Sequence, residues 1–159
     1  MRWFLALSIA TLAGCSCDLD HITLDDRWRP LKRIQKQQGI AEGIYSTVGE
    51  VILTSDPCEF LRADPVSQNG LLRHEQLHAL RQQEIGYVDY IRRYAVDLGF
   101  RADEERAAWH LQIDYVVKHG GAVDPDYIAS VFTEHYMVWT REAVIAWVNS
   151  EIAAAKAGR

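Results

Sequence analysis

Residues 71–83, with the sequence LLRHEQLHALRQQ, contain the spacing that most constrains this chain. His74, Glu75 and His78 stand in the order His-Glu-x-x-His. The segment lacks Pro and Gly and consists mostly of strong helix formers, which predicts a helix over residues 71–85. Residues four apart lie on one face of a helix, so His74 and His78 could share a Zn²⁺ ion at ~2.0–2.1 Å. The spacing therefore predicts a zinc site with these two histidines as ligands.

Glu75 is the predicted catalytic residue. It lies about 100° around the helix from His74, so it can reach a metal-bound water without displacing a ligand, which suits a general base. The alternative is that both histidines are simply polar residues on a surface helix. Leu71 and Leu77 flank the histidine face, however. The imidazoles are therefore expected at the margin of a core, where unpaired polar groups are costly.

Residues 1–14 have the pattern of a bacterial lipoprotein signal peptide. Arg2 is followed by an apolar run over residues 3–12, which is too short to span a bilayer as a helix. Residues 12–15, LAGC, closely resemble a lipobox, in which Cys15 is lipidated and becomes the mature N-terminus. Ser16 follows instead of the Asp that commonly retains lipoproteins in the inner membrane. We therefore expect a lipid anchor on Cys15 in the outer membrane, facing the periplasm. An ordinary cleaved signal peptide is the alternative.

The remaining cysteines are Cys17 and Cys58. Disulfides persist outside the cytoplasm, so a bridge between these two residues is possible. Cys58 could equally be a small buried hydrophobic residue. The sequence leaves both interpretations open.

The charge pattern argues against nucleic acid as a partner. The net charge is −5, and the single basic cluster follows a group of aspartates, so no basic stripe is left uncompensated. We interpret residues 15–38, which contain this cluster, as a solvated linker. The cluster consists of Arg27, Arg29, Lys32, Arg33 and Lys36.

Residues 39–159 are predicted to form one domain that is mainly α (α+β). Runs rich in β-branched residues over 44–48 and 51–54 flank Gly49-Glu50 and predict a β-hairpin. Asp56-Pro57 should end the hairpin, and residues 64–70 should form a loop before the zinc helix. Further helices are predicted over residues 87–98 and 102–119, from Pro125 with Asp124 as N-cap, and from Thr140.

A zinc site of this kind needs a third protein ligand. The metzincin pattern requires Gly at position 81 and a ligand at position 84, but Arg81 and Glu84 occupy these positions. Residues 103–109, DEERAAW, contain Glu-x-x-Ala starting from either Glu104 or Glu105. Together with HEQLH, this motif resembles the gluzincin metallopeptidases, in particular small single-domain bacterial ones, over residues 71–115.

The resemblance implies a zincin-like fold and a set of roles. A Glu of the downstream helix would be the third ligand, the strand before the zinc helix would bind an extended peptide, and Glu75 would activate the attacking water. The family commonly uses a Tyr or His to stabilise the oxyanion. Tyr127, His135 and Tyr136 are candidates, each of which could equally be a packing residue.

A helical wheel separates the candidate third ligands. Glu105 falls in the middle of the apolar stripe of its helix, whereas Glu104 falls at the edge. A carboxylate in a buried stripe is costly unless it meets a cation. We therefore predict Glu105 as the third ligand, with Glu104 and then Glu84 as alternatives.

The sequence thus predicts a lipid-anchored zinc metallopeptidase of the bacterial envelope that acts on a peptide or protein substrate. The alternative is a noncatalytic envelope lipoprotein in which structural zinc stabilises a binding module. Structural sites usually have four protein ligands. His110 and His119 are candidates for the fourth, although His110 projects from the polar side of its helix.

Overall fold

The computed structural model describes residues 20–158. Within these residues the chain is mainly helical with one small sheet, so the α+β prediction is confirmed. The strands are β1 (His21–Thr23), β2 (Arg33–Lys36), β3 (Tyr45–Val48) and β4 (Val51–Thr54). The helices are α1 (Pro57–Arg62), α2 (Pro65–Ile85), α3 (Tyr87–Val96), α4 (Leu98–Lys118), α5 (Pro125–Ser130) and α6 (Arg141–Ala157), with a 3₁₀ turn η1 (Asp26–Trp28) and a π-helical turn η2 (Val131–His135).

The predicted hairpin is confirmed as β3 and β4, but it belongs to a larger sheet of order β1-β2-β4-β3. β2 runs parallel to β4, and β1 pairs with β2. The prediction of a linker over residues 15–38 is therefore wrong for residues 20–38. Trp28, Leu31 and Ile34 are buried against the helices. The basic residues between them stay exposed, which gave the segment its linker-like composition.

Three Asp-Pro pairs begin helices in this fold. Asp56, Asp64 and Asp124 are N-caps whose side chains accept hydrogen bonds from first-turn N–H groups, and each following Pro occupies the start of the helix. The loop predicted for residues 64–70 is therefore wrong, because these residues form the first turns of α2. The helices predicted after residue 86 are confirmed with boundaries shifted by a few residues.

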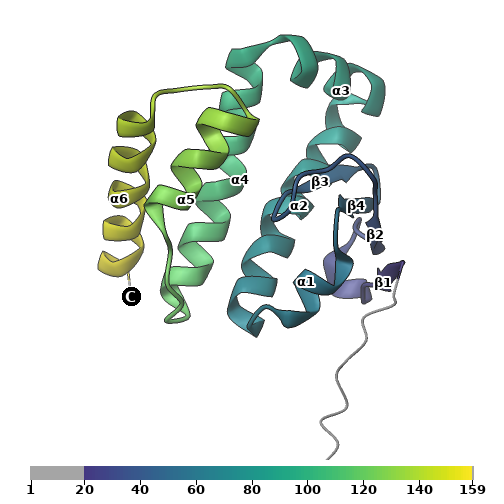
Figure 1. Ribbon diagram of the computed structural model, residues 1–159, viewed down its shortest axis with the longest axis horizontal. Coiled ribbons are helices and arrows are strands. Elements are labelled where there is room, and N and C mark those ends of the chain that lie inside the picture. The colour runs from purple at the N-terminus through teal and green to yellow at the C-terminus, as the bar shows by residue number, and fades with distance from the viewer. Residues whose placement is uncertain (1–19, 159) are drawn as a thin grey trace, which may run out of the picture.

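Helix α2 lies between the sheet and α4 and carries the histidines (Figure 1). On its other side α4 packs against α6, with α5 and η2 completing an apolar cluster. The two long helices approach closely at Gly70, where an added Cβ would lie 2.7 Å from Val116 Cγ2. Helix α3 contacts both α2 and α4. This packing turns the histidine face of α2 towards the first half of α4.

No helix in the described part of the chain is long and apolar enough to cross a membrane. The predicted signal peptide, Cys15 and Cys17 lie outside residues 20–158. Cys58 is buried near the start of α1. The lipid anchor and the Cys17–Cys58 disulfide therefore stay predictions.

Candidate metal centre

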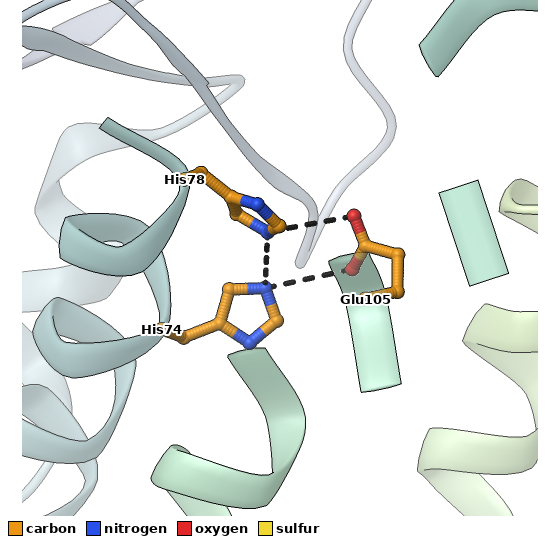
Figure 2. Close-up of side chains that lie close together, drawn as sticks. All are labelled: His74, His78 and Glu105. Carbon is orange, nitrogen blue, oxygen red and sulfur yellow. Dashed lines mark hydrogen bonds and ion pairs between the residues drawn. The ribbon is translucent and has the colours of Figure 1, made fainter. Parts of the chain in front are cut away.

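The side chains of His74, His78 and Glu105 meet between α2 and α4 (Figure 2). Their residues are only 3%, 6% and 3% exposed. His74 Nε2 lies 3.1 Å from His78 Nε2 and 3.6 Å from Glu105 Oε2, while His78 Nε2 lies 3.5 Å from Glu105 Oε1. Three buried donor atoms from two helices therefore converge on one point.

These separations match those expected around a single zinc ion. A tetrahedral ion with ligands at ~2.0–2.1 Å holds its ligand atoms about 3.3–3.4 Å apart. Glu105 Oε2 is buried and has no hydrogen-bond partner among the described residues, although it faces His74 Nε2. A buried carboxylate oxygen without a donor is costly, and a cation would remove that cost. The residues present therefore fit zinc in both geometry and charge.

The pKa values of Glu105 and His74 also indicate that the centre favours a positive charge. Burial alone would raise the pKa of Glu105, but the positive charges of His78 and His74 and the hydrogen bond from Tyr94 lower it to about 2. Burial would likewise lower the pKa of His74, yet Glu105 and Glu75 raise it. The carboxylate is thus held in its anionic form, which is the form that binds a metal.

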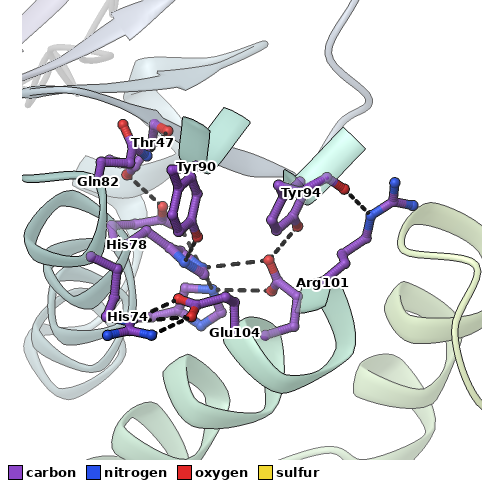
Figure 3. A network of polar contacts seen from close by, with 11 residues as sticks. Thr47, His74, His78, Gln82, Tyr90, Tyr94, Arg101 and Glu104 are labelled. Atoms are coloured by element: carbon purple, nitrogen blue, oxygen red, sulfur yellow. Dashed lines mark hydrogen bonds and ion pairs between the residues drawn. The ribbon is translucent and has the colours of Figure 1, made fainter. Parts of the chain in front are cut away.

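Two tyrosines of α3, Tyr90 and Tyr94, contact His78 and Glu105 (Figure 3). The Tyr90 hydroxyl lies 3.0 Å from His78 Nδ1, and the Tyr94 hydroxyl donates a short hydrogen bond to Glu105 Oε1. Burial and the charge of nearby carboxylates raise the pKa of both tyrosines well above the usual value, so both stay protonated. When His78 Nδ1 donates to Tyr90, the lone pair of Nε2 is left pointing at the centre.

Arg101 holds this supporting helix in place. Its guanidinium donates to the carbonyls of Tyr94 and Ala95 at the end of α3 and to the carbonyl of Tyr136 after η2. Carbonyls at the end of a helix lack intrahelical partners, so a buried Arg can satisfy several at once. Arg101 therefore ties the end of α3, and with it Tyr94, to the segment that carries Tyr136.

Glu75 faces the centre without being part of the convergent set. Its residue is 2% exposed, and its Oε1 lies 3.9 Å from His74 Nε2. Its Oε2 accepts a 2.6 Å hydrogen bond from Thr47 Oγ1 on β3. The carboxylate is therefore fixed at one oxygen and directed towards the histidines with the other, as expected for a base beside a metal.

Gln82 connects α2 to the hairpin. Its amide donates to the Thr47 carbonyl at 2.8 Å and accepts from the Gly49 N–H at 2.7 Å (Figure 3). Neither Gln82 nor Thr47 was identified from the sequence. Gln82 lies one turn after His78 on the same face of α2, which was the one available signal.

The structure places Glu105, and not Glu104 or Glu84, beside the two histidines. Glu104 is 5% exposed, which differs from its expected position at the helix edge, and it forms an ion pair with Arg81 at 3.0 Å. Glu84 is exposed and pairs with the same arginine at 2.8 Å. Both alternative carboxylates thus form ion pairs with Arg81 and lie away from the two histidines.

The two proposed fourth ligands also lie elsewhere. His110 is exposed and contacts Glu151 at 2.7 Å, while His119 stacks on Tyr115 at the end of α4. Among the described residues, the only convergent group of His, Cys, Asp or Glu side chains is His74, His78 and Glu105.

Two pockets flank the centre along β3. One, the α1 pocket, has a volume of about 200 Å³ and extends from His74 and Glu75 towards α1 and Tyr127. The other, the α3 pocket, has a volume of about 230 Å³ and extends towards α3 and His135. Tyr136 lines both. Burial and the charge of Glu105 raise the pKa of the Tyr136 hydroxyl well above the usual value. Of the three oxyanion candidates, Tyr136 is therefore the one that faces both sides of the centre.

No family model, curated protein or solved structure matches this chain. The functional interpretation therefore depends on the residues and their geometry.

Proposed function

We propose that this protein is a zinc-dependent peptidase attached to the bacterial envelope by a lipid on Cys15. The observation that carries the proposal is the convergence of His74, His78 and Glu105 at tetrahedral separations, with the buried Glu75 carboxylate beside them. Envelope attachment is supported by the LAGC sequence at residues 12–15. The similarity to gluzincins supports the same reaction class.

The chain's own residues can perform the proton transfers of peptide hydrolysis. Bound zinc would polarise a peptide carbonyl and make water more acidic. Glu75 then takes the proton of the attacking water and delivers it to the leaving amine, while Thr47 keeps the carboxylate in position. Tyr136 stays protonated and can donate a hydrogen bond to the developing oxyanion.

Strand β3 suits an extended substrate because it forms one edge of the sheet, next to the centre. Alternate residues of an antiparallel strand direct their backbone groups to the same side. The Thr47 carbonyl accepts a hydrogen bond from Gln82 of α2 and therefore points away from β4. Tyr45 lies two residues earlier, so its backbone groups also point to the side of β3 that faces away from β4. A peptide lying there would add a strand to the sheet and cross both pockets.

A structural zinc site in a binding module is the alternative. Structural sites usually fill all four positions with protein ligands, whereas the described residues supply three. A buried Glu75 held by a dedicated hydrogen bond also serves no purpose in such a site. Both observations favour the enzyme.

Metal analysis combined with X-ray absorption at the zinc edge tests the proposal. We expect one zinc per chain, coordinated by two imidazoles, one carboxylate and one solvent oxygen, and peptidase activity that chelation removes and zinc restores. Four protein ligands without solvent would favour the binding module. Failure to bind zinc would contradict both functions.

A further inference from the structure

Glu59 of α1 lines the α1 pocket without a role in the metal centre. A Cβ added at Gly43 would lie 3.9 Å from Glu59 Oε1 and 3.7 Å from Tyr127 Oη. The Tyr127 hydroxyl also donates to the Gly43 carbonyl at 3.1 Å. Glu59, Tyr127 and Gly43, which precedes β3, therefore lie together at one wall of the α1 pocket. His74 and Glu75 line the same pocket.

Glu59 is a half-buried residue, and one oxygen of its carboxylate lacks a hydrogen-bond partner among residues 20–158. Its Oε2 is buried and receives no hydrogen bond from any residue that the structure describes. The guanidinium of the nearby Arg62 of α1 forms its ion pair with Asp56, at 2.6 Å, and within the described residues no ion pair joins it to Glu59. A buried acceptor without a donor destabilises a fold, so a carboxylate placed this way suits a ligand that brings the missing donor.

The walls of the α1 pocket suit a cation. Tyr45, Tyr127 and Trp109 line it, and aromatic faces attract cations. Burial, and after it the negative charge of Glu59, raises the pKa of both Tyr45 and Tyr127. The charge of Glu59 is therefore felt across the pocket. No Lys or Arg lines the pocket within the described residues.

We propose that the α1 pocket binds a cationic side chain, lysine or arginine, of the substrate next to the scissile bond, with Glu59 as the residue that selects it. This inference rests on the proposed peptidase function, because it assigns a specificity to the same cleft. A protonated amine or guanidinium would donate to Glu59 Oε2 and lie against the aromatic walls. The substrate side chain must therefore carry a positive charge and be long enough to reach from β3 to α1.

The test compares peptides that differ at a single position. The zinc-loaded protein is given N-acetylated hexapeptides with lysine, arginine, norleucine or glutamate at each position in turn, and kcat/KM and the cleavage site are measured. We expect lysine and arginine next to the cleaved bond to be preferred over norleucine by about tenfold or more. In Glu59→Gln this preference should fall below about threefold.

Glu42→Gln is the matched control. It removes the same charge from an exposed residue of the neighbouring segment that does not line the pocket, so it should keep the preference. Equal use of lysine and norleucine by the wild type, or an undiminished preference in Glu59→Gln, would overturn the assignment. The same hexapeptides with a free N-terminus are tested alongside. A preference confined to them would also overturn the assignment, because the pocket would then recognise the terminal ammonium.

A binding measurement separates this inference from the proposed reaction. The zinc-loaded Glu75→Gln variant is titrated with the lysine and norleucine hexapeptides by calorimetry. Tighter binding of lysine that depends on Glu59 would support the pocket assignment even if no peptide were cleaved. Cleavage without any lysine preference would leave the peptidase standing and refute the assignment.

Discussion

Thr47 Oγ1 donates a 2.6 Å hydrogen bond to Glu75 Oε2, and this bond joins the edge strand of the sheet to the proposed catalytic carboxylate. Thr47 and Glu75 are both buried, so water cannot easily replace the bond when it is lost. The strand that we expect to bind the substrate thus also positions the base.

Thr47→Val should lower kcat by about tenfold, because the carboxylate loses its fixed orientation while the side-chain volume is kept. Thr47→Ser should restore most of the activity, since it keeps the hydroxyl. Zinc content should be equal in all three proteins. A loss of zinc in the Val variant would show that Thr47 supports the fold of the centre and not only Glu75.

Tyr90→Phe should weaken zinc binding by about 10- to 100-fold, because His78 Nδ1 loses its oxygen partner. Competition with a fluorescent chelator gives the affinity. Tyr87→Phe is the matched control, since Tyr87 lies on the same helix and is 47% exposed. Equal affinities of the two variants would contradict the supporting role of Tyr90.

Glu105→Ala and Glu104→Ala should affect different properties. The first removes a predicted ligand and should weaken zinc binding by at least about 100-fold. The second removes the buried partner of Arg81, which keeps only the exposed Glu84, and should lower Tm by about 2–4 °C with little change in zinc affinity. Chelator competition and thermal unfolding separate the two effects. The reverse pattern would mean that the ligand is one residue earlier.

Gly70→Ala should destabilise the protein despite the better helix propensity of alanine. The added Cβ would lie 2.7 Å from Val116 Cγ2, and overpacking costs about 1–3 kcal/mol, against roughly 1 kcal/mol gained from propensity. Urea unfolding measures the difference. An unchanged or higher free energy of unfolding would show that α2 and α4 can separate without cost.

Local patterns explain which parts were predictable from the sequence. The HEQLH spacing and the capping signals after residue 86 act within one helix, and the hairpin depends on one short turn. The Asp-Pro pairs at residues 56 and 64 carry the same helix-start signal as the pair at 124, although the neighbouring turn residues favour the prediction of loops there. Strands β1 and β2 were missed because they have only three and four residues and expose polar or charged side chains at both ends.

The surroundings of the centre could not be predicted, because they depend on contacts between distant segments. The helical wheel placed Glu105 on the inner face of its helix but could not show that Glu104 forms an ion pair with Arg81. Thr47 and Gln82 come together across 35 residues, and Tyr90 reaches His78 only because α3 folds back over α2. Such contacts require the positions of the helices in space.

The most direct test of the central claim is the rate of peptide hydrolysis per bound zinc in Glu75→Gln. Glu75 lies outside the convergent ligand set, and glutamine preserves its shape. We predict one zinc per chain in wild type and variant alike, with a rate in the variant that is lower by about 100-fold or more. A variant that holds zinc and hydrolyses peptides at the wild-type rate would contradict Glu75 as the base and with it the proposed mechanism.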